Sequence, residues 1–410
     1  MGPPKLSSRP APPIAPAFPW VGLLTLAGAI FVSVTSEFLP TGLLPEMAHD
    51  LGVSVATTGL LVTVFAGTVV AATTPLATLT KRFPRKALVI AVLLVIAVAN
   101  LGAALAPTYG VLVAARVLGA CAHGLFWGVV ATYPTYLVSG RHLGRALAIT
   151  AAGGSAAFVL GVPVGTALGH LLGWRAAFAI IAGAVVVLAG VVVAYLPSAP
   201  RKRETATGEI PLPVRHDRSM RGVALICAVI VTLLVGQNVL STYVAPWLVE
   251  QAHLPSASVP LLLLVFGAAG ALGLVGAGML ADRAPRRGFA AMILVVMAAV
   301  LVLALCTRST PLVVLAVAIW GMAFGGVPAM LQTRMMRTAS PQVRDLAGAL
   351  QTTAFNVGIG GGALLGSLLI IDAGVGVLPV ASLLFLAAGL ALSFAPEAVR
   401  LGARRLAPTG

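Results

Sequence analysis

Residues 278–287 read Gly-Met-Leu-Ala-Asp-Arg-Ala-Pro-Arg-Arg and form a short charged segment between two long apolar runs. A related segment lies 201 residues earlier, where residues 77–86 read Ala-Thr-Leu-Thr-Lys-Arg-Phe-Pro-Arg-Lys. The same offset relates Pro45 to Pro246. A repeat at about half the length of a 410-residue chain indicates two similar halves, each built from apolar segments.

The composition is typical of a protein with many membrane-spanning segments. Hydrophobic residues make up 59% of the chain and charged residues only 9%, whereas a soluble domain has about 25% charged residues. A spanning helix needs about 20 apolar residues, and at such lengths only helices satisfy their own backbone in lipid. We therefore predict an all-α membrane protein with twelve transmembrane helices. They are expected near residues 19–44, 55–79, 87–107, 110–138, 146–171, 174–197, 222–248, 258–281, 289–307, 310–336, 346–371 and 375–396.

The distribution of basic residues predicts the orientation of these helices. If the N-terminus is cytoplasmic, 23 of the 26 basic residues fall in cytoplasmic segments, and basic residues mark that side of a membrane. We therefore expect both termini inside. The net charge of +15 then reports topology and contact with the lipid bilayer, and it gives no reason to expect nucleic acid as a partner.

The connections divide the chain into five parts. We expect a disordered cytoplasmic tail at 1–18, an N-terminal six-helix bundle at 19–197, a polar cytoplasmic linker at 198–221, a C-terminal six-helix bundle at 222–397 and a cytoplasmic tail at 398–410. The three cysteines fall inside apolar runs, which argues against disulfides and thiolate metal sites. No phosphate-binding Gly-Lys-Ser/Thr loop is present, and the short loops leave no room for an enzyme domain.

Several motifs together resemble the major facilitator superfamily of secondary transporters. The charged segment at 278–287 resembles the family's loop between spans 8 and 9, and residues 116–124 resemble its Arg-containing motif in span 4. Residues 36–45 and 320–328 resemble the arabinose-efflux and chloramphenicol-efflux branch of twelve-span drug:proton antiporters. The resemblance implies two pseudo-symmetric bundles, a monomer in the bacterial inner membrane, and a proton gradient as the energy source, with no cofactor and no metal.

A glycine- and proline-rich motif in the fifth run is similar to the antiporter motif of such exporters. It comprises Gly161, Pro163, Gly165 and Gly169. Small residues and proline permit close helix approach and a bend. The motif either serves rocking during alternating access or only allows close packing.

Two charged residues lie well inside the predicted spans. Glu37 is the one acid there, and Arg116 is the one base. Counted from the ends of their runs at 1.5 Å per residue, both lie roughly 9–12 Å from the outer side. An ionisable group at such depth is costly and suggests function. We expect Glu37 to carry the coupling proton and Arg116 to modulate it; the alternative is a static ion pair that fixes helix register.

His123 and Trp127 follow Arg116 at spacings of seven and eleven residues, which places all three on nearly one face of a helix. His123 is a candidate proton relay, or else it only bonds a neighbouring helix. Trp127 is expected to line the substrate cavity, unless it packs elsewhere.

Polar residues in the second half mark a further part of the expected cavity. Asn238 occupies the repeat position of Glu37. Polar groups facing lipid would lack partners, so these residues are expected to bind the small-molecule substrate or to bridge helices. They are Gln237, Asn238, Ser241, Tyr243, Gln332 and Asn356.

The charged loops are expected to form a cytoplasmic gate. By resemblance, Asp282 should meet the start of the fifth span near Arg145, where the helix dipole favours an anion. The first copy of the motif carries Lys81 instead, and we expect a charge-swapped contact with Asp345; the alternative is that Lys81 only marks the cytoplasmic side. The remaining basic gate candidates are Arg85, Arg283 and Arg286.

The sequence therefore favours a proton-coupled exporter of small molecules by alternating access. Sugars, drugs and phenicol-type antibiotics are what the resemblance implies as substrates, with antibiotic resistance as a possible outcome. A proton-driven importer of a metabolite is a second interpretation, although the glycine and proline motif argues against it. A non-transporting scaffold or receptor is a third, but a scaffold gains nothing from burying charge.

Overall fold

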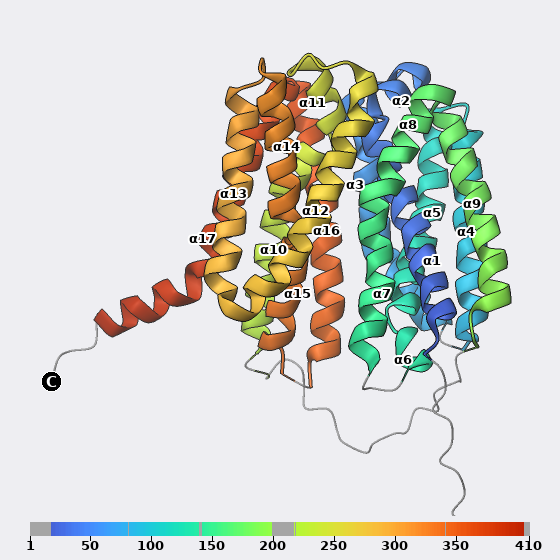
Figure 1. Cartoon of the computed structure of the whole chain (residues 1–410), viewed down its shortest axis with the longest axis horizontal. Coiled ribbons are helices and arrows are strands. Elements are labelled where there is room, and N and C mark those ends of the chain that lie inside the picture. The colour runs from blue at the N-terminus through green and yellow to red at the C-terminus, as the bar shows by residue number, and fades with distance from the viewer. Residues whose placement is uncertain are drawn as a thin grey trace, which may run out of the picture.

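The protein is a bundle of helices packed side by side (Figure 1). The computed structural model describes residues 18–80, 82–138, 142–198, 217, 219–340 and 342–405, with only the backbone at 278–282, 345 and 395–405. In this part of the chain, twelve helical segments are long and apolar enough to cross a membrane. The prediction of twelve spans in an all-α protein is confirmed.

The first half supplies six of these segments. The helix α1 (Trp20–Phe38) continues through the 3₁₀ turn η1 (Leu39–Gly42), and the fifth span has a π-helical turn, η3 (Ala157–Gly161), in its middle. The remaining helices are α2 (Leu44–Leu51), α3 (Val55–Thr80), α4 (Arg85–Ala104), α5 (Tyr109–Val130), α6 (Pro134–Leu137), α7 (Leu143–Ala156), α8 (Val162–Leu172) and α9 (Trp174–Tyr195).

The second half supplies the other six. It contains α10 (Met220–Ser241), α11 (Val244–Glu250), η5 (Ser256–Ser258), α12 (Val259–Arg283), α13 (Pro285–Leu305), α14 (Thr310–Gly325), α15 (Val327–Thr338), α16 (Arg344–Ala373), η6 (Val375–Val377) and α17 (Leu378–Arg405). The helix α17 extends past residue 397, so the segment expected as a tail begins as helix. Most of the linker expected at 198–221 lies outside the described residues.

The charged segment at 278–287 is a sharper hinge than the sequence predicts. The helix α12 runs through Arg283 and α13 starts at Pro285, so that Ala284 alone separates them. Proline is well suited to the first turn of a helix, where its missing N–H has no helical partner anyway. In the first half, Pro84 likewise precedes the start of α4 at Arg85.

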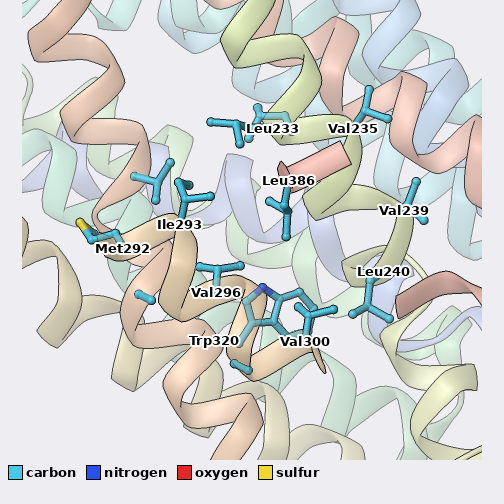
Figure 2. Packing of buried hydrophobic residues seen from close by; sticks show 14 of the residues in the cluster. Leu233, Val235, Val239, Leu240, Met292, Ile293, Val296, Val300, Trp320 and Leu386 are labelled. Atoms are coloured by element: carbon cyan, nitrogen blue, oxygen red, sulfur yellow. The ribbon is translucent and has the colours of Figure 1, made fainter. Parts of the chain in front are cut away.

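Each half has its own apolar core. In the second half, α10 contributes Leu233 and Val239, α13 contributes Val296, and α14 contributes Trp320, as Figure 2 shows. The first half has a separate cluster built around α1, α4, α5 and α9. Two cores of this kind are expected of two bundles that each fold around their own helices.

The halves touch mainly away from the end that carries Arg85, Arg145 and Arg286, here called the basic end. The Thr63 hydroxyl of α3 donates to the Gly360 carbonyl of α16 at 3.0 Å, and the Ser367 hydroxyl donates to the Ala56 carbonyl at 3.0 Å. Gly267 of α12 lies against the backbone of Phe158 in η3. The ribbons α12 and α8 approach each other at the end opposite to the basic end, and the two halves diverge towards the basic end (Figure 1).

Candidate functional site

Glu37 and His123 form a polar pair inside the first bundle. Glu37 lies in the last turn of α1, and His123 lies in α5. The Oε2 atom of Glu37 is 3.2 Å from Nε2 of His123, and the two side chains are only 12% and 5% exposed. A carboxyl group and an imidazole in contact within a membrane can hold or release a proton between them.

Two further side chains fix the imidazole. Trp127 Nε1 donates a hydrogen bond to His123 Nε2 at 2.8 Å, and the Ser33 hydroxyl lies 2.9 Å from His123 Nδ1. Each partner is one helical turn from a member of the pair, because Ser33 precedes Glu37 by four residues and Trp127 follows His123 by four. Residues four apart share a helix face, so α1 and α5 present two polar side chains each to the same contact.

Arg116 holds the end of α1 rather than the carboxyl group of Glu37. Its Nη1 atom donates to the Ser36 carbonyl at 2.8 Å, and its Nη2 atom donates to the Glu37 carbonyl at 2.9 Å. The Ser36 carbonyl has no helical donor, because the residue four positions later is Pro40, which lacks an N–H. The hydrogen bonds show that Arg116 caps a helix that proline has interrupted. The expected action of Arg116 on the Glu37 carboxyl group stays a prediction.

The polar residues of α10 are paired within the second bundle. The Gln237 Oε1 atom accepts from Trp320 Nε1 at 2.8 Å, and Asn238 donates to the Leu234 carbonyl of its own helix at 2.9 Å. Both side chains are buried. Gln237 therefore bridges α10 and α14, as the helix-bridging alternative predicts, whereas Asn238 bonds within its own helix. These hydrogen bonds leave fewer polar atoms of the two side chains available to a substrate.

Tyr243 is fully buried where the halves meet. Its hydroxyl donates to the Ala363 carbonyl at 2.8 Å, and its ring packs against Gly59 of α3 and Gly366 of α16. This position corresponds to the helix-bridging alternative for Tyr243. Gly59 is required here, since a Cβ atom would overlap the tyrosine ring.

Three other expected cavity residues are more accessible. Ser241 and Asn356 are partly buried, and Gln332 is exposed. The Asn356 amide donates to the Thr352 carbonyl within α16 at 3.1 Å.

The glycines of the motif pack against the stretch from α1 through η1 to Leu43. Added Cβ atoms would overlap Thr35 at Gly161, Leu39 at Gly165 and Leu43 at Gly169. Pro163 stands at the start of α8, directly after the π-helical turn. The motif therefore brings the fifth span into close contact with the first at the point where the helix geometry changes, as π-turns and proline do.

The gate residues are only partly described. Lys81 and the side chains of Asp282 and Asp345 lie outside the described residues. The Arg145 guanidinium stacks on the rings of Phe18 and Trp20, with its carbon 4.8 and 4.5 Å from the two ring centres. Arg145 is thus held within its own half. Arg283 and Arg286 are exposed and Arg85 is partly buried, all at the basic end.

Sequence reasoning missed two residues of the polar pair's surroundings. Ser33 is one turn before Glu37, and this spacing was a usable signal. Phe65 of α3 gave no signal, because an aromatic residue in an apolar run looks like core; its ring lies 5.3 Å from the His123 ring and 4.3 Å from the Arg116 guanidinium carbon.

Comparison with known proteins identifies the family. The model of the Major Facilitator Superfamily matches residues 26–363 and, in a second match, residues 235–405. The chain belongs to the Major Facilitator Superfamily. Like its relatives in this superfamily, it is a multi-pass membrane transporter of small molecules and not an enzyme.

One protein with a similar sequence is a "probable sugar efflux transporter" of Helicobacter pylori. The two are 29% identical over 346 residues, which cover 84% of this chain and 87% of the relative. A second strain of that species has a protein of the same description and the same identity.

Solved structures agree with the major facilitator fold. A bacterial homologue of the human lysosomal transporter Spinster, in an inward-facing and unoccupied conformation, superposes with a TM-score of 0.74 at 16% identity, covering 93% of this chain and 97% of the other. A nucleoside transporter superposes with a TM-score of 0.70 at 16% identity, covering 92% and 98%. At such identities the likeness concerns the fold alone.

Proposed function

We propose that this transporter exports small, uncharged, hydroxyl-bearing molecules across the bacterial inner membrane in exchange for protons. Sugars are the first class to test, because sugar efflux is the described activity of relatives at 29% identity over most of the chain. The motifs that resemble drug:proton antiporters extend the candidates to drugs and phenicol-type antibiotics.

The observation that carries this proposal is the buried contact between Glu37 and His123. A carboxyl group inside a membrane is costly and is retained for function. The pair can exist with or without a proton, and its two members come from different helices. A proton that enters or leaves would change how α1 and α5 fit together, and this change gives alternating access a way to depend on the proton gradient.

The basic end is assigned to the cytoplasm by the positive-inside rule. The contacts between the halves lie towards the opposite end, which fits a state that is open to the cytoplasm. Closure on that side would bring Lys81 to Asp345 and Asp282 to Arg145, the residues expected to form the gate.

A single chain contains both bundles, so a monomer suffices for transport.

The substrate is expected to contact polar atoms that remain accessible between the halves. Ser241, Asn356 and Gln332 supply such groups, and none of them is charged. Neutral donors and acceptors suit hydroxyl-bearing solutes, whereas an ionic substrate would require a charged partner for binding.

A transport assay in proteoliposomes tests the proposal. Vesicles containing the purified chain are given a pH gradient, and uptake of radiolabelled sugars, sugar analogues and chloramphenicol is followed. We expect gradient-driven exchange for at least one solute, and its loss in Glu37→Gln.

The matched control is Glu250→Gln, which removes an exposed carboxyl group at the end of α11 and should leave the gradient dependence unchanged. Gradient-driven transport that persists in Glu37→Gln would refute the coupling role. Transport that follows solute gradients only, with no proton movement, would refute exchange altogether.

A further inference from the structure

One atom of His123 has two neighbours, and it cannot bond to both of them once it carries a proton. Its Nε2 atom lies 2.8 Å from Trp127 Nε1 and 3.2 Å from Glu37 Oε2. An unprotonated ring nitrogen accepts hydrogen bonds, whereas a protonated one donates. The indole N–H only donates. The proton on Nε2 therefore decides whether His123 can hold Trp127.

The arrangement in the structure corresponds to Nε2 without a proton. His123 then carries its proton on Nδ1 and donates it to the Ser33 hydroxyl, while Nε2 accepts from Trp127. An ionised Glu37 would direct lone pairs at a nitrogen that itself has a lone pair. Glu37 is consequently protonated in this state, and its O–H points to Nε2.

Loss of one proton from the pair reverses these hydrogen bonds. Glu37 becomes a carboxylate, and the neutral imidazole shifts its proton from Nδ1 to Nε2, where it donates to Glu37. Ser33 turns its hydroxyl to donate to Nδ1. One proton has left and one negative charge has been gained. Trp127 now faces an N–H and has lost its acceptor.

The surroundings leave the indole as the group free to respond. His123 is only 4% exposed, whereas Trp127 is partly buried and packs against the core of the first half. The charged groups near the imidazole are Glu37 of α1 and Arg116 of α5. The helices α3 and α4 contribute the neutral Phe65 and Asn100, and Asn100 accepts from the Ser36 hydroxyl at 2.9 Å.

We propose that Trp127 is a substrate-binding residue that His123 holds while the Glu37–His123 pair is protonated, and that deprotonation frees its indole N–H to donate to an acceptor oxygen of the transported molecule. This inference rests on the proposed function and adds the chemistry of recognition. The substrate offers a hydroxyl, ether or carbonyl oxygen to Trp127, and substrate and proton compete through one hydrogen bond, as exchange requires.

The hydrogen bond of the Trp127 indole can be followed by ultraviolet resonance Raman spectroscopy of the purified full-length chain across a range of pH. The difference between wild type and Trp127→Phe isolates its signal. We expect the bonded signature at the acidic side and an unbonded signature as the pH rises. A Trp127 signature that stays constant over the pH range in which transport changes would overturn the inference.

Trp320 provides a matched control from the equivalent helix pair of the second half. Its indole donates to the Gln237 amide, which does not titrate in this range, so the wild-type minus Trp320→Phe signature should stay bonded throughout. The variant His123→Gln retains an acceptor oxygen but cannot be protonated, and it should make the Trp127 signature independent of pH. If Trp127→Phe does not fold, the spectrum of His123→Gln can be subtracted from that of wild type at each pH. The part of the difference that changes with pH then comes from the Trp127 indole.

The two proposals fail differently. A Trp127 signature that titrates in a chain that moves none of the tested solutes contradicts the proposed function and leaves the hydrogen-bond switch in place. Proton-coupled export with a Trp127 signature that does not titrate contradicts the switch alone.

Discussion

Replacing Arg116 by Met should destabilise the first bundle strongly. The guanidinium supplies hydrogen bonds to the Ser36 and Glu37 carbonyls at 2.8 and 2.9 Å, and Pro40 cannot replace the first of them. A buried polar group left without a partner costs about 1–3 kcal/mol, so two carbonyls give roughly 2–6 kcal/mol. The side chain is 4% exposed, which leaves little access for water to compensate.

Thermal unfolding of the detergent-purified protein measures this effect. A cooperative unit of 150–250 residues loses about 2–4 °C of Tm per kcal/mol, so Arg116→Met should lower the Tm on the order of 10 °C. Arg116→Lys restores a charge but not the planar fork, and it should recover roughly half of that loss.

The control is Arg175→Met, which removes a half-exposed arginine that also donates to a carbonyl, that of Ala106, at 3.0 Å. Exposed arginine contacts are worth up to about 1 kcal/mol, so this variant should shift the Tm far less. An Arg116→Met protein that melts within about 2 °C of wild type would refute the view that Arg116 caps α1.

Three other variants test separate parts of the structure. Trp320→Phe leaves the buried Gln237 carbonyl oxygen without its donor and should cost about 1–3 kcal/mol, measured as a lower Tm. Gly161→Val places a side chain where η3 meets Thr35 of α1; overpacking costs about 1–3 kcal/mol, and a lower Tm should accompany slower transport in proteoliposomes. The hydrogen bond from Ser340 lowers the pKa of Asp217, so this carboxylate stabilises the fold above its unfolded pKa of about 3.9, and the Tm difference from Asp217→Asn should vanish as the pH falls through the lowered value.

Each of these three variants has a control that distinguishes the loss of the named contact from a general loss of stability. Adding Gln237→Leu to Trp320→Phe removes both partners and should recover part of the stability. Gly190 has open space around it, so Gly190→Val should be nearly neutral where Gly161→Val is not. Ser340→Ala removes the hydrogen bond that lowers the pKa of Asp217, and in that background Asp217→Asn should show a smaller pH-dependent Tm difference. Equal effects within any of these comparisons would contradict the corresponding explanation.

Much of the candidate site follows from spacing along single helices. Glu37 and Arg116 are recognisable because an ionisable residue in a long apolar run is rare and costly. His123 and Trp127 share a face because they are four residues apart. Which partner each group chooses depends on how α1 and α5 are rotated and offset, and spacing within one helix contains no information about that.

The twelve apolar spans, the two halves and the family could be predicted from the amino-acid order, because length, hydropathy and the repeated charged motif are properties of the chain read in order. The packing of the helices was needed to show that Arg116 caps the helix end at Pro40, that Glu37 contacts His123, and that Tyr243 lies buried at a contact between the halves. These pairings join residues far apart in the chain, and their geometry is set by the packing of helices against one another, where differences of about one ångström select one hydrogen-bond partner over another.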